Sequence, residues 1–121
     1  MLGAMKTRHD KLVRDRIPEL LAERGIPHEI RVADRMELPA LLHAKLEEET
    51  AEYLAATDDE ARIEELADML EVVLGFGRFC GADRDSLERV RAQKAIERGA
   101  FDARIVLISA GTDEENARPI G

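Results

Sequence analysis

The sequence has few of the features that mark disulfide-bonded or membrane proteins. Its 121 residues include one cysteine, one tyrosine and no tryptophan, so no internal disulfide can form and a reducing compartment is expected. The longest apolar stretch, residues 69–81, contains Glu71 and Arg78 and is too short to cross a bilayer. No basic and apolar leader opens the chain. We therefore expect a cytoplasmic protein with no membrane partner, in which Cys80 is buried as a small hydrophobe beside aromatic neighbours.

The charge balance limits the class of ligand. Acidic residues outnumber basic residues 26 to 18, which gives a net charge of −8. A nucleic-acid polymer would be repelled over most of such a surface. A small phosphorylated ligand remains compatible with this charge, because it needs only local cations or a metal ion held by carboxylates.

Hydrophobic periodicity predicts a mainly α-helical domain with one small β element. Pro18 and Gly25 are typical of the first turn and the end of a short helix that Asp15 caps. Asp85 and Glu88 have the spacing of a capping box at the start of the last helix. The predicted helices span residues 14–25, 36–56, 58–81 and 85–99, and a two-stranded sheet pairs residues 28–34 with 103–109. We expect one domain over residues 11–110, with tails at 1–10 and 111–121.

Acidic side chains crowd residues 47–68, and their positions on a helical wheel separate them into outward and inward groups. Leu42, Leu46 and Tyr53 define the buried stripe of the helix over residues 36–56. Glu49 falls in the middle of this stripe, whereas Glu47 points to solvent. Because an ionised carboxylate on an apolar face costs several kcal/mol unless it is paired or bound to metal, Glu49 needs a partner.

Two pairs of acids with the same spacing indicate what that partner is. Glu49 and Glu52 are three residues apart on one helix, and Glu65 and Asp68 are three apart on the next, so each pair projects from one face. Four converging carboxylates would repel one another and raise their own pKa values. A hard divalent cation removes this conflict, and Mg²⁺ prefers oxygen ligands, with Mn²⁺ as a substitute. The spacing therefore predicts a metal site.

Basic residues offer an alternative explanation for the inward acids. Lys94 and Arg98 share the inward side of the helix over residues 85–99, and Lys11 and Arg14 precede the start of the first helix, where anions are favoured. Lys94 and Arg98 are either structural partners of the carboxylates or phosphate contacts beside a metal site. The sequence pattern leaves both roles open.

The two acidic segments resemble a known signature. EETAE at residues 48–52, followed by EELAD at residues 64–68, is similar to the Glu-Glu-x-x-Glu and Glu-x-x-Asp motifs of the MazG-like, all-α nucleoside triphosphate pyrophosphohydrolases. KLVRDRIPELL, which begins at Lys11, and KAIERGAFDARIVL, which begins at Lys94, look like the branch described as phosphoribosyl-ATP pyrophosphohydrolase-like or house-cleaning. Together the matches span residues 11–108.

The resemblance implies a fold, a reaction and roles for particular residues. The fold would be a MazG-like helical bundle completed by oligomerisation as a homodimer or homotetramer. The reaction would be Mg²⁺-dependent cleavage of a nucleotide between its α- and β-phosphates, and it would remove non-standard nucleotides. The implied metal ligands are Glu49, Glu52, Glu65 and Asp68, the auxiliary catalytic acid is Glu48, and the phosphate contacts are Lys11, Arg14, Lys94 and Arg98.

Two other functions fit the same residues. One is a true phosphoribosyl-ATP pyrophosphohydrolase of histidine biosynthesis, which would use the same metal site on a larger substrate. The other is a non-catalytic helical interaction module whose acids bind a basic partner. An absence of Mg²⁺ binding would favour the interaction module.

Overall fold

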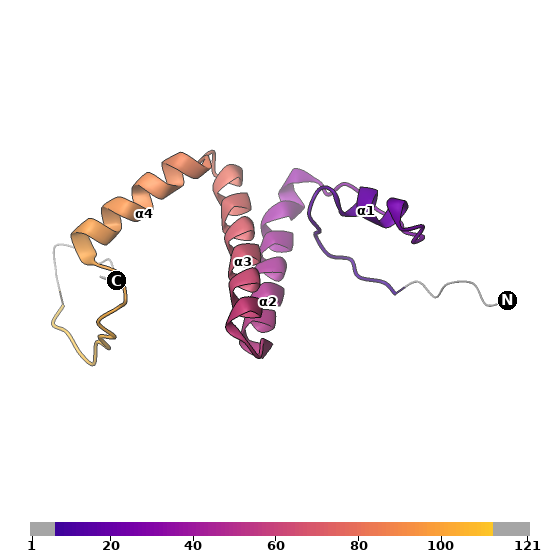
Figure 1. Ribbon diagram of the computed structural model, residues 1–121. Helices are drawn as coiled ribbons and strands as arrows, with labels where there is room; N and C mark the ends of the chain where they lie inside the picture. Colours follow the sequence, from indigo (N-terminus) through magenta and orange to yellow (C-terminus); the bar gives the residue numbers. More distant parts are fainter. Residues whose placement is uncertain (1–6, 113–121) are drawn as a thin grey trace. The chain divides into compact units, whose positions relative to one another are not determined.

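The computed structural model describes residues 7–112, and the outer parts of both predicted tails, residues 1–6 and 113–121, lie outside the described residues. The described chain is mainly helical, as predicted (Figure 1). Its elements are α1 (Ile17–Glu23), the 3₁₀-helix η1 (Arg35–Glu37), α2 (Leu38–Ala55), α3 (Asp59–Phe79) and α4 (Arg84–Arg98). The chain divides into two compact units, one ending at Ala82 and one beginning at Asp83.

Short polar side chains fix where the long helices begin. Asp58 accepts a hydrogen bond from the Ala61 backbone N–H at 2.7 Å and so caps α3. Asp83 caps α4 in the same way through Ser86, at 2.8 Å. The prediction that Asp85 caps this helix is therefore wrong, because Asp85 already lies within its first turn.

The limits of α1 confirm two of its three predicted end signals, and Pro18 lies in the first turn as predicted. Gly25 has a φ of 67° just after the helix, a conformation that favours glycine, so its predicted role as a stop is confirmed. The predicted cap at Asp15 is wrong. The N-cap residue of α1 is Arg16, and no side chain makes a capping hydrogen bond at this helix start.

Helices α2 and α3 form an antiparallel hairpin, and they lie side by side in Figure 1. Among the described residues, Leu42 on α2 and Val72 on α3 are the buried hydrophobic side chains. Gly75 lets the helices approach closely, because a Cβ atom there would lie 3.1 Å from Leu42 Cδ2. Glu49 is also buried in this interface, at 5% exposure, which confirms its inward position on the helical wheel.

The predicted two-stranded β element is wrong, because no strand occurs among residues 7–112. Residues 28–34 belong to the first unit and residues 103–109 to the second, and their β-branched side chains at Val32 and Ile105 are exposed. A β-strand is stable only when its backbone N–H and C=O groups bond to a neighbouring strand. Local β propensity alone therefore did not decide the structure of these segments.

A row of exposed apolar side chains runs along the side of α3. Its members, at helical spacing, are Ile63, Leu66, Leu70 and Val73, and we call them the α3 apolar row. Cys80 is also exposed, so its predicted burial is wrong, since it lies just past the last residue of the helix. None of the helices in the described part of the chain is long and apolar enough to cross a membrane.

Candidate functional site

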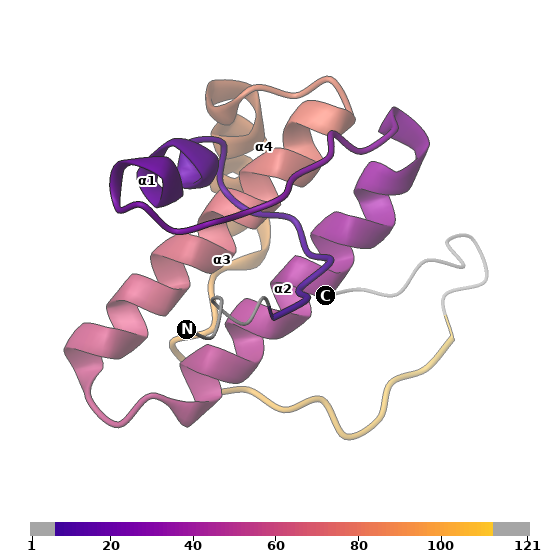
Figure 2. The same ribbon diagram turned by 90° about the vertical axis from the view of Figure 1, so that its right-hand side faces the viewer.

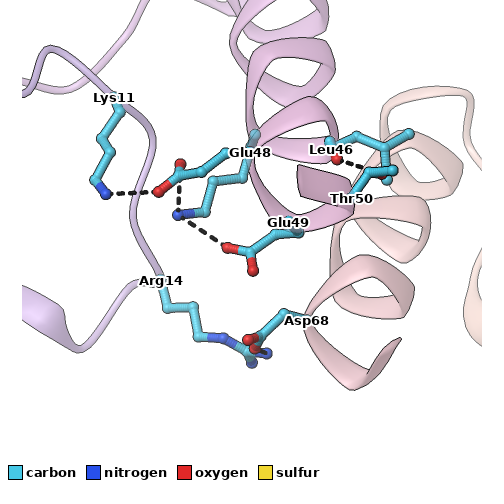
Figure 3. Close-up of polar contacts among 8 residues, drawn as sticks. Lys11, Arg14, Leu46, Glu48, Glu49, Thr50 and Asp68 are labelled. Carbon is cyan, nitrogen blue, oxygen red and sulfur yellow. Dashed lines mark hydrogen bonds and ion pairs between the residues drawn. The ribbon is translucent and has the colours of Figure 1, made fainter. Parts of the chain in front are cut away.

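Three carboxylates from the two helices of the hairpin gather at one place. Glu49 on α2 and Glu65 and Asp68 on α3 each offer an oxygen atom, and these oxygens lie within 4.8 Å of one another. Figure 3 shows Glu49 and Asp68 extending toward the same space from their two helices. We call these three residues the acid cluster. The antiparallel pairing of α2 and α3 brings together three of the four acids that the sequence spacing singled out, and Glu52 is outside the cluster but close enough to affect the pKa of Glu65.

Two oxygens of the acid cluster are buried without a hydrogen-bond partner in the described part of the chain. They are Glu49 Oε2 and Glu65 Oε2. Ionised carboxylates only accept hydrogen bonds, so two of them satisfy each other only when a proton or a cation lies between them. The adjacent carboxylate of Glu49, desolvation and the nearby carboxylate of Glu52 raise the pKa of Glu65 to about 7. The acid cluster thus has the electrostatic strain that a bound cation relieves.

Lys45 is a further cation at the site, and it was not among the residues predicted from the sequence. Its Nζ lies 3.3 Å from Glu49 Oε1 and 3.3 Å from Glu48 Oε2, and its side chain is only 18% exposed. The signal was present in the sequence, because Lys45 precedes Glu48 and Glu49 by three and four residues on one helix. Lys45 occupies one oxygen of Glu49 and leaves Oε2 without a partner.

The segment before α1 supplies two further cations, and Figure 2 shows it crossing the α2–α3 hairpin. Lys11 Nζ donates to Glu48 Oε1 at 2.7 Å, and this contact lowers the pKa of Glu48. Arg14 Nη2 donates to Asp68 Oδ1 at 2.8 Å, while its Nη1 lies 3.8 Å from Glu71 Oε1. Lys11 and Arg14 thus lie against the acids, and their predicted contact with phosphate stays a prediction.

The charges around the acid cluster do not balance. The carboxylates are the cluster itself with Glu48 and Glu52, and the cations in contact with them are Lys11, Arg14 and Lys45. Among the described residues of this site, five acids face three cations, which leaves two negative charges in excess when all five acids are ionised. Glu71, which Arg14 also approaches, is paired with Arg78. One divalent cation would neutralise this surplus, and carboxylate oxygens are the ligands that Mg²⁺ and Mn²⁺ prefer. The residues present fit such an ion.

The other predicted site residues are not part of the acid cluster. Glu52 is exposed on α2, near enough to Glu65 to raise its pKa. Glu48 has one oxygen on Lys11 and the other on Lys45. Lys94 and Arg98 are exposed on α4, in the second unit, so their contact with phosphate stays a prediction.

Comparisons with known proteins identify no family for this chain. No family model matches it, and no solved structure matches it. An uncharacterized protein of Mycolicibacterium smegmatis is 48% identical over 54 residues, which cover 45% of this chain and 55% of the relative. The matched stretch thus spans about half the length of the curated relative.

Proposed function

We propose that the protein is a Mg²⁺-dependent nucleoside triphosphate pyrophosphohydrolase that cleaves between the α- and β-phosphates and releases a monophosphate and pyrophosphate. The observation that carries this proposal is the buried Glu49 Oε2, which has no partner and belongs to the same cluster as Glu65 and Asp68. The MazG-like signature at residues 48–52 and 64–68 suggests the reaction and a house-cleaning role toward non-standard nucleotides.

Each part of the site has a role in this proposal. The acid cluster holds the cation, with Glu52 as a further ligand. A bound divalent cation supplies charge neutralisation and water activation for phosphoryl transfer. Lys11 and Arg14 bind phosphate oxygens, because both are partly exposed cations beside the acids. Glu48 positions Lys11 and Lys45, and its additional role in orienting water is proposed from the resemblance alone, as are the phosphate contacts of Lys94 and Arg98.

A homodimer is part of the same proposal. The α3 apolar row exposes large side chains along one helix, and the described core contains only two buried hydrophobic residues, Leu42 and Val72. A second copy of the chain that covered this row would bury apolar surface that the single chain leaves in water.

Pyrophosphate release is the measurement that tests the proposed reaction. A panel of canonical, deoxy and damaged nucleoside triphosphates, with phosphoribosyl-ATP included, separates a house-cleaning enzyme from an enzyme of histidine biosynthesis. We expect release in Mg²⁺ or Mn²⁺ and none in EDTA. Asp68→Asn should reduce the rate by at least about 100-fold, since it removes a metal ligand.

The control is Glu47→Gln, which carries the same charge change on a side chain that is 71% exposed. The Arg14–Asp68 pair is partly exposed, so Asp68→Asn should lower stability by less than about 1 kcal/mol and leave the fold intact. Equal pyrophosphate release by the wild type, Asp68→Asn and Glu47→Gln would overturn the catalytic assignment. Complete absence of metal binding would favour the interaction module instead.

A further inference from the structure

Arg14 meets the acid cluster at a single carboxylate. Its guanidinium donates to Asp68 Oδ1 at 2.8 Å, and Asp68 also contributes an oxygen to the cluster with Glu49 and Glu65. Arginine stays protonated at every pH relevant to the protein. Arg14 therefore already neutralises part of the charge that a divalent cation would use.

The two lysines and the arginine differ in how firmly they are held. Lys45 is 18% exposed and lies on the same helix as the two acids that it contacts. Arg14 is 53% exposed and belongs to a segment without helix or strand. Its link to Asp68 spans 54 residues of sequence and consists of side-chain contacts. Arg14 contacts a carboxylate of the acid cluster and is the most exposed of the three cations. Its side chain is therefore the one most free to leave the cluster.

We propose that Arg14 competes with the divalent cation for Asp68, so that cation binding releases the guanidinium to bind a phosphate of the nucleotide. This inference rests on the proposed function, and it adds a coupling between the two ligands. In the metal-free protein Arg14 partly compensates the acid cluster. In the metal-bound protein the cation takes over that compensation, and the freed Arg14 attracts the substrate. Metal and nucleotide then favour each other's binding, because each disfavours the Arg14–Asp68 pair.

The competition predicts a change in metal affinity that is measured without turnover. Titration calorimetry of the full chain with Mn²⁺ alone, without nucleotide, measures the affinity of the acid cluster. Arg14→Gln should bind Mn²⁺ about fivefold more tightly than the wild type, the scale expected for loss of a partly exposed ion pair. The same variant should raise the KM for the nucleotide. Loss of a merely structural residue would not tighten Mn²⁺ binding and at the same time raise the KM for the nucleotide.

Two neighbouring cations provide matched controls. Lys11→Gln removes the same charge from the same segment, but Lys11 contacts Glu48, which is outside the acid cluster. It should change Mn²⁺ affinity by less than about twofold. Arg16→Gln removes a cation whose partner is Glu19 at 3.1 Å, and it should leave Mn²⁺ affinity unchanged. If Arg14→Gln fails to fold, Arg14→Lys, which keeps the charge and loses the planar fork, should tighten Mn²⁺ binding by about twofold.

The outcomes of these titrations distinguish the competition from the metal site itself. Tighter Mn²⁺ binding confined to Arg14→Gln supports the competition. Unchanged or weaker Mn²⁺ binding by Arg14→Gln overturns it and leaves the metal site standing. Equal tightening by Lys11→Gln also overturns it, because the effect would then be a general one of charge. A wild-type chain that binds no Mn²⁺ removes the proposed function itself, and the competition with it.

Discussion

Replacing Glu49 with glutamine tests the metal site through stability alone. Glu49 is 5% exposed, its Oε1 lies 3.3 Å from Lys45 Nζ, and its Oε2 has no partner. The amide introduced by Glu49→Gln keeps the shape of the side chain, removes the charge and gains an N–H group that can donate to Glu65. In the absence of metal, Glu49→Gln should therefore stabilise the protein.

The size of the effect follows from these contacts. A buried polar atom without a partner costs about 1–3 kcal/mol. Lys45 keeps its ion pair with Glu48 and can still donate to the amide oxygen of the glutamine, so the weaker contact at residue 49 costs about 1 kcal/mol. The free energy of unfolding should therefore rise by about 1 kcal/mol, and by no more than about 2 kcal/mol, with metal chelated. For a chain of this size, the melting temperature should rise by about 3–10 °C.

The assay is thermal unfolding of the wild type and Glu49→Gln in EDTA and in Mg²⁺. Mg²⁺ should raise the melting temperature of the wild type, because it binds the folded state, and it should have little effect on Glu49→Gln. The order of stability should then reverse between EDTA and Mg²⁺. Glu47→Gln, an exposed control on the same helix, should follow the wild type in both. A destabilised Glu49→Gln in EDTA, or one with the wild-type response to Mg²⁺, would refute the reasoning.

Two further predictions concern pH and assembly. Metal-free wild type should gain stability as the pH falls from about 8 to about 5.5, because the pKa of Glu65 is raised to about 7 from its ordinary value of 4.5, so the folded state binds the proton first. Melting curves in saturating Mg²⁺ should lose this dependence, and a flat metal-free profile over that range would contradict it. Leu70→Glu, in the α3 apolar row, should convert a dimer to a monomer in light scattering with helix content unchanged, whereas Val32→Glu, exposed elsewhere, should not. A monomer mass for the wild type in light scattering would contradict the proposed homodimer.

The sequence by itself determined the helices and the inward position of Glu49. Both depend on interactions within a few residues: periodicity decides which side of a helix is apolar, and polar or glycine residues mark where it ends. The three long helices accordingly begin and end within two residues of their predicted limits. The spacing of Glu49 with Glu52, and of Glu65 with Asp68, also indicated which acids share a helix face.

Only the tertiary structure decided how the charges are paired. Arg14 and Asp68 are 54 residues apart in sequence, and Lys11 and Glu48 are 37 apart, so neither contact has a local signature. The sequence left open whether Lys11 and Arg14 contact the acids, and the hairpin of α2 and α3, crossed by the segment before α1, resolves this. Strand pairing failed as a prediction for the same physical reason: a strand needs a distant partner, and β propensity at residues 28–34 and 103–109 does not supply one.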